Sequence, residues 1–261
     1  MQDLTLNTDS NARRDRRQAL AMTAVAMVAV YILWNLSVFD FLLTPLRLFV
    51  TYVHEAGHGL MAILTGGKIA GFMVSPNGSG LTQTLGGSRA LILPAGYLGA
   101  AFFGSMLFYT INRFPRAINN IAIALGAGMV LFTLVYARAD EAGTLMAFTL
   151  GIGFGVLLIL VGARAPRLGA LLIVNVLAVS TALEAVLDLW NLLSYIGATR
   201  GEVHNDAAAF ARDITPLIPA SFVALTWALL AVMMFGAAVY FGVWKRLRIE
   251  IDDAYTSLRQ R

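Results

Sequence analysis

The chain has 261 residues, of which 58% are hydrophobic and only 13% are charged; its formal net charge is +4 and it has no cysteine. A soluble domain of this length needs far more charge on its surface. The lack of cysteine excludes disulfides, thiolate metal sites and cysteine nucleophiles. The basic residues form no stripe interleaved with aromatic residues, so we expect contact with anionic lipid headgroups and no nucleic-acid binding.

Seven apolar stretches are long enough to cross the roughly 30 Å hydrocarbon layer as helices. They cover residues 19–38, 42–64, 89–111, 117–137, 142–162, 168–195 and 217–243. Backbone groups in lipid must bond to one another, which leaves only helices or a closed barrel. The stretches lack the two-residue alternation of barrel strands. We therefore expect an all-α polytopic membrane protein with six or seven transmembrane helices.

The two ends of the chain are polar tails, residues 1–18 and 244–261, and the transmembrane domain between them covers 19–243. Four arginines (Arg13, Arg14, Arg16 and Arg17) stand just before the first apolar stretch, which is too long for a signal peptide. We expect a retained first helix and a cytoplasmic N-terminus. Seven alternating spans would place Lys245, Arg246 and Arg248 on the opposite side, against the positive-inside bias.

Two polar segments interrupt the transmembrane domain. Residues 67–86 contain two short β-prone stretches around Pro76-Asn77-Gly78-Ser79, and an Asn-Gly pair in this setting predicts a β-hairpin. Residues 197–215 read as a polar loop followed by a short interfacial helix, with Asn205 or Asp206 as its N-cap.

The most informative motif is VHEAGHGL at residues 53–60. His54 and His58 are four residues apart, so a helix places both imidazoles on one face, where they can share a metal ion. Glu55 is placed to take a proton from a water molecule that a zinc ion has acidified. Ionisable residues inside a transmembrane helix are costly and indicate function.

A catalytic zinc usually has three protein ligands, so the two histidines need a partner. We favour Asp188, because helix rise places it at about the same membrane depth as the histidines if the second and sixth spans run the same way. Asp206 is the alternative, since its loop can fold back into the site. Glu184, one turn from Asp188, is a substitute ligand or a hydrogen-bond partner of a histidine. His204 is a further ligand candidate.

The sequence resembles the site-2 protease family of intramembrane zinc metalloproteases, in particular its small bacterial and plant branch. The resemblance rests on VHEAGHGLMAILTGG, on VSPNGSGLTQT followed by LPAGYLGAAFFGS, and on the distal LDLWNLL and HNDAAAFA segments. It implies that His54 and His58 bind zinc, that Glu55 is the general base, and that the protein is multi-pass in a bacterial cell membrane. Leu187-Asp188 is followed by Leu189, where the best-known members have glycine.

The sequence therefore predicts a zinc-dependent endopeptidase whose substrates are transmembrane or membrane-proximal segments of other proteins. The first alternative is a non-catalytic scaffold that retains the fold; the intact Glu55 argues against it, because a binding protein needs no general base. The second is an ion transporter, which the lack of an internal repeat disfavours.

Overall fold

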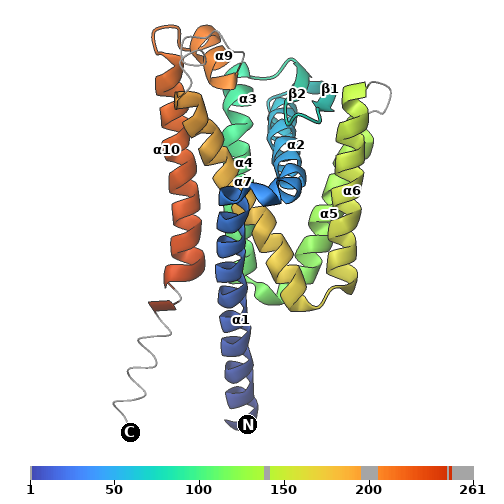
Figure 1. Cartoon of the computed structure of the whole chain (residues 1–261), viewed down its shortest axis with the longest axis vertical. Coiled ribbons are helices and arrows are strands. Elements are labelled where there is room, and N and C mark those ends of the chain that lie inside the picture. The colour runs from blue at the N-terminus through green and yellow to red at the C-terminus, as the bar shows by residue number, and fades with distance from the viewer. Residues whose placement is uncertain (1, 138–141, 195–204, 246, 249–261) are drawn as a thin grey trace.

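Helices make up most of the described chain, which comprises residues 2–137, 142–194, 205–245 and 247–248 in a computed structural model (Figure 1). The helices are α1 (Gln2–Asn35), α2 (Asp40–Leu64), α3 (Arg89–Ile92), α4 (Tyr97–Arg113), α5 (Ile118–Tyr136), α6 (Ala142–Arg164), α7 (Arg167–Ser194), α9 (Asp206–Asp213) and α10 (Ala220–Val239). The strands are β1 (Lys68–Val74) and β2 (Gly80–Leu85). The predicted fold class, all-α and polytopic with a small hairpin, is confirmed.

The number of helices that are apolar enough to span a membrane reaches the lower value of the six or seven predicted. Within the described residues, five qualify by length and composition, or six if the bent pair α3–α4 is one span. The stretch that fails is α2, which has 25 residues but carries Asp40, Arg47, Glu55 and two histidines. The ionisable residues of the motif therefore lower the mean hydropathy of α2.

The first two long helices run in the same direction. Figure 1 shows α1 rising from the end of the molecule where α10 ends, and ending inside the molecule, where the 3-10 turn η1 (Ser37–Phe39) leads into α2. From there α2 continues to the end that carries the hairpin and α9. The beginning of α1 and the end of α10 therefore lie at the same end, which differs from the arrangement of seven alternating spans.

The third predicted span is broken rather than continuous. Pro94 lacks a backbone N–H, and at that point the helix changes to the 3-10 turn η2 (Leu93–Ala95). The segment Arg89–Ala95, which includes this turn, and α4 differ in axis direction by 54°. The break places Gly96 beside α2.

The predicted hairpin is present, with β1 and β2 antiparallel and Val74 opposite Gly80. Gly78 has φ +87° in the connecting turn, a conformation that glycine adopts readily. The hairpin packs on α2, where the hydroxyl of Thr51 donates to the carbonyl oxygen of Gly78 at 2.9 Å. This contact fixes the hairpin turn against the helix that carries the motif.

The short helix α9 is also present as predicted, with Asn205 as its N-cap. The Asn205 side chain accepts a hydrogen bond of 2.8 Å from the backbone N–H of Ala208. The apolar face of α9 packs Ala207 and Ala211 against α10, where Trp227 closes the cluster. At its other end, Asp213 forms an ion pair of 2.6 Å with Arg89 of α3. These contacts hold α9 beside the break that precedes α4.

Candidate metal centre

The two histidines of the motif lie on one face of α2, as their spacing predicts. Nε2 of His54 and Nε2 of His58 are 3.0 Å apart. The ring planes are inclined at 75° with centroids 4.8 Å apart, so both nitrogens converge on one point. His58 is buried and His54 is half-buried, with its ring edge-on to the ring of Tyr97 at 4.6 Å.

The third group at this point is the carboxylate of Asp206, the first residue of α9. Its Oδ2 lies 3.1 Å from Nε2 of His54 and 3.2 Å from Nε2 of His58. Burial raises the pKa of the Asp206 carboxyl, but the hydrogen bonds and charges of the two histidines together lower it by more. This pKa therefore lies well below its usual range. The carboxylate is therefore ionised, which is the form that binds a cation.

The orientation of His58 is set by a backbone carbonyl. Its Nδ1 lies 2.7 Å from the carbonyl oxygen of Ile92, at the end of α3. A carbonyl only accepts, so Nδ1 carries a proton, and in the neutral imidazole Nε2 is the nitrogen left to bind a metal, on the side of Asp206 and His54. Metal-binding histidines usually have such a partner on the second ring nitrogen.

Two glycines allow the broken helix to approach the histidines closely. A Cβ on Gly96 would lie 2.4 Å from Nε2 of both His54 and His58. A Cβ on Gly57 would lie 2.2 Å from the carbonyl oxygen of Ala95. Side-chain carbon atoms do not approach other atoms this closely, so the space beside the two nitrogens exists because these positions have no side chain.

The carboxylate of Glu55 is held by the hairpin. Glu55 is buried, and the hydroxyl of Thr82 lies 2.7 Å from its Oε2 and 2.9 Å from its backbone oxygen. Gly80, where β2 begins, packs so tightly on this side chain that a Cβ would lie 2.5 Å from Oε1. The first residues of β2 thus fix the buried carboxylate of Glu55, which follows the candidate ligand His54 in the sequence.

The other candidate ligands take different positions. Glu184 lies outside the group of three; its Oε1 is 3.8 Å from Nε of Arg47, two helical turns before His54 on α2. Asp188 belongs to α7, one turn further on, but its side chain lies outside the described part of the structure, as does His204. Asp188 as a ligand therefore stays a prediction, while Asp206 lies at the histidines.

Sequence reasoning missed Gly96 and Thr82 as parts of the site. The signal for Gly96 is a Pro94-Ala95-Gly96 break inside an otherwise apolar stretch, which marks a departure from regular helix. Thr82 carries no comparable signal, because its role depends on the packing of the hairpin on α2.

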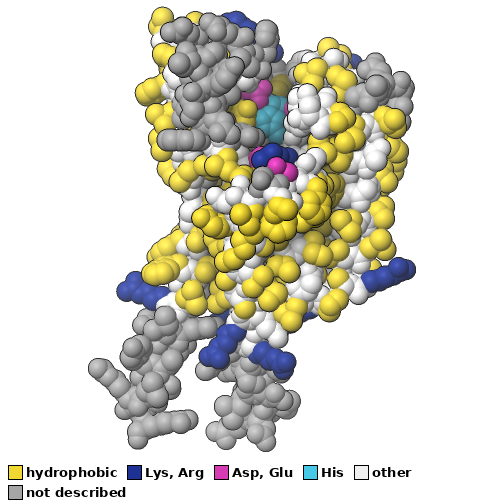
Figure 2. Space-filling model, in the orientation of Figure 1, with side chains coloured by type: hydrophobic (Ala, Val, Ile, Leu, Met, Phe, Trp, Pro, Cys, Tyr) yellow, Lys and Arg dark blue, Asp and Glu magenta, His cyan; other side chains and the backbone are white. Residues whose placement is uncertain are grey.

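Figure 2 shows histidine side chains in a hollow of the half of the molecule that carries the hairpin, with acidic side chains beside them. Hydrophobic side chains dominate the surrounding surface. The site is thus open on this face, although it lies among helices with apolar exteriors.

Comparison with known proteins identifies the family. The sequence model of the family described as Peptidase M50B-like matches residues 22–238, which include α2, the hairpin and α9. No curated protein and no solved structure matches the chain. A metallopeptidase family is consistent with a group of His54, His58 and Asp206 that could hold a metal ion. The chain belongs to the Peptidase M50B-like family, within the site-2 protease family of metallopeptidases.

Proposed function

We propose that this protein is a zinc-dependent intramembrane endopeptidase that hydrolyses peptide bonds in or near transmembrane segments of other membrane proteins. The observation that carries the proposal is the convergence of three ligand atoms from His54, His58 and Asp206, next to the buried carboxylate of Glu55. The family supports the peptidase activity. The apolar surface around the hollow supports a substrate that arrives within the membrane.

The spacing of the three ligand atoms fits a zinc ion. In a tetrahedral site with metal–ligand distances of about 2.0–2.1 Å, two ligand atoms are about 3.3 Å apart. The three separations here are 3.0, 3.1 and 3.2 Å. Two imidazoles and one carboxylate also make a donor set typical of catalytic zinc, with a fourth position left for water or substrate. We propose Asp206 rather than Asp188 as the third ligand on this ground.

The bound ion would polarise the scissile carbonyl and acidify a water molecule. Glu55 is the base that accepts the proton of that water as it attacks the carbonyl carbon, and then donates the proton to the leaving amine. The hydroxyl of Thr82 orients the Glu55 carboxylate through Oε2. The Ile92 carbonyl keeps the proton of His58 on Nδ1 and away from the ligand nitrogen.

The test combines metal content with cleavage. Wild type, His54→Ala, Asp206→Ala, Asp188→Ala and Glu55→Gln are purified in detergent, and zinc per chain is measured by mass spectrometry. We expect about one zinc per chain in the wild type, in Asp188→Ala and in Glu55→Gln, and loss in the other two. Cleavage of a single-span peptide with helix-breaking residues in its apolar segment should fall by about 10²–10⁴-fold in Glu55→Gln.

Three results would change the conclusion. Zinc that is lost from Asp188→Ala but kept by Asp206→Ala moves the third ligand to α7. A wild type that binds zinc but cleaves no single-span peptide in a varied panel supports the non-catalytic scaffold. A wild type that takes up no zinc after incubation with the metal ends the proposal.

A further inference from the structure

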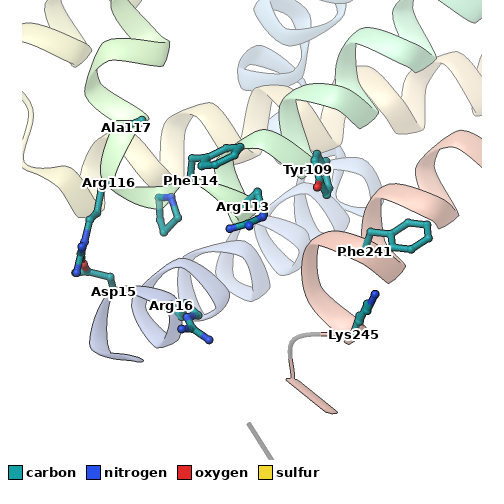
Figure 3. A pocket seen from close by; sticks show the side chains of 10 residues that line it. Asp15, Arg16, Tyr109, Arg113, Phe114, Arg116, Ala117, Phe241 and Lys245 are labelled. Carbon is teal, nitrogen blue, oxygen red and sulfur yellow. Dashed lines mark hydrogen bonds and ion pairs between the residues drawn. The ribbon is translucent and has the colours of Figure 1, made fainter. Parts of the chain in front are cut away.

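A pocket lies at the opposite end of the molecule from the candidate metal centre, at the end where α1 begins and α10 ends (Figures 1 and 3). Its volume is about 710 Å³, within the range of small-molecule sites. It is lined by α1, by the end of α4 and its connection to α5, and by the π-helix η4 (Tyr240–Trp244) with the following Lys245. Candidate spans begin or end in each of these segments, at Arg14, Arg113, Pro115 and Trp244. The pocket thus lies at the level where the bilayer has its phosphate groups.

The charge of the lining is strongly positive. Four cationic side chains (Arg16, Arg113, Arg116 and Lys245) line it together with a single carboxylate, that of Asp15. The Asp15 carboxylate is already bound by two guanidinium groups, from Arg116 and from Arg167. Figure 3 shows this ion pair on one side of the pocket, Lys245 on the other, and Arg16 and Arg113 between them. A dianionic or monoanionic phosphate is the ligand that such a lining attracts.

The same pocket has apolar walls. Phe114 and Phe241 line it, and each is 52% exposed. Arg113 lies over the ring of Phe114 at 5.1 Å, and the ammonium group of Lys245 lies 5.9 Å from the ring centre of Phe241. Each cation is therefore paired with an aromatic surface that faces outward. A soluble phosphate has no apolar part that would contact these rings, whereas the glycerol and upper acyl chains of a phospholipid can pack on them.

We propose that this pocket binds the headgroup phosphate of an anionic phospholipid, with Arg113 and Lys245 as its principal contacts and with Phe114 and Phe241 against the upper acyl chains. This assignment is independent of the peptidase proposal. Basic pockets between transmembrane helices at the side that faces an anionic leaflet have this function in other membrane proteins. The pocket would hold one lipid against the beginning of the α1 span, the end of α4 and the segment that follows α10.

The experiment is native mass spectrometry of the full chain released from detergent, titrated with phosphatidylglycerol or with phosphatidylcholine of the same acyl chains. We expect the wild type to bind phosphatidylglycerol more tightly. The double variant Arg113→Gln/Lys245→Gln should weaken this binding on the order of 30-fold, since each basic residue near an anionic surface contributes about one factor of five. Thermal unfolding of the same samples, followed by circular dichroism, shows whether the variant is folded.

The matched control is Arg164→Gln, which removes an exposed arginine from the last turn of α6 and outside the pocket. It should bind phosphatidylglycerol as the wild type does. Equal binding of the two lipids by the wild type, or an equal loss in Arg164→Gln, would overturn the proposal, because either result means general surface attraction. Competition by inorganic phosphate at the lipid's own concentration would instead assign the pocket to a soluble anion and overturn the lipid assignment.

Discussion

At the scale of single residues, the metal centre depends on one missing side chain as much as on the side chains present. Gly96 lies beside both ligand nitrogens, where any Cβ would come within 2.4 Å of them. The chain reaches this position because the helix is interrupted at Leu93–Ala95. The break before α4 thus places the backbone of Gly96, without a side chain, against the two histidine nitrogens.

We expect Gly96→Ala to lose metal affinity while the protein stays folded. The added methyl group must push His54 or His58 away from the convergence point, since it cannot lie 2.4 Å from both nitrogens. Changes that disturb the orientation of ligating histidines typically cost about 10–100-fold in metal affinity. The measurement is zinc affinity by competition with a chelator, with thermal unfolding followed by circular dichroism.

Gly99→Ala is the matched control for Gly96→Ala, three residues further along the same chain segment. A Cβ on Gly99 meets only the Cα of Gly57, at an ordinary contact distance of 3.5 Å. Wild-type zinc affinity in Gly96→Ala would show that the histidines have room to move, and would remove the steric role assigned to this glycine.

The ligands themselves differ in how far the sequence reveals them. His54, Glu55 and His58 follow from a spacing within two helical turns, so local geometry is enough to predict them. Asp206 is 152 residues from His54, and only the packing of α9 against α3 and α10 brings them together. The expected membrane depth of Asp188 favoured it as the third ligand, but the sequence does not reveal where α9 packs.

At the scale of elements, the hairpin supports the carboxylate of Glu55, the proposed general base. The Asn-Gly pair predicts the turn, because φ +87° at Gly78 is accessible to glycine. The register that places Thr82 at Glu55 is not predictable from the strands alone, since it depends on contacts with α2 such as that of Thr51. The sequence therefore predicts the hairpin turn, but not the packing of the hairpin on α2.

We expect Thr82→Val to lower kcat for peptide cleavage by about 10–100-fold while zinc content and KM stay near wild type. Valine keeps the shape of threonine but loses the donor to Oε2 of Glu55, and a hydrogen bond to a charged group contributes about 1.5–3 kcal/mol. Thr82→Ser keeps the donor and should recover most of the rate. The measurement is steady-state cleavage of a single-span peptide in detergent.

Thr84→Val provides the comparison for Thr82→Val, with the same substitution two residues along β2 and on the same face of the strand. It should leave kcat unchanged. If Thr84→Val and Thr82→Val reduce the rate equally, the effect belongs to the stability of the strand and not to the orientation of Glu55.

At the scale of the whole molecule, the arrangement of the long helices resolves a conflict in the charge pattern. Seven alternating spans would separate the two basic termini. In the structure, α1 and α2 run the same way, so the beginning of α1 and the end of α10 lie at one end (Figure 1). That end also carries Arg113, Arg116, Arg164 and Arg167 at the ends of α4, α6 and α7 and in the turn before α5. Hydropathy finds apolar stretches but does not give their direction.

We therefore expect the two termini on one side of the membrane and the hairpin on the other, with the termini cytoplasmic by the positive-inside rule. Since the chain has no cysteine, a single engineered cysteine reports each position: Ser10→Cys in α1, Ser79→Cys in the hairpin turn, and Arg248→Cys after α10. A membrane-impermeant maleimide applied to intact bacterial cells should label Ser79→Cys alone, and all three after permeabilisation. Labelling of Arg248→Cys alone in intact cells, with Ser10→Cys and Ser79→Cys both protected, is the pattern of seven alternating spans and would contradict this arrangement.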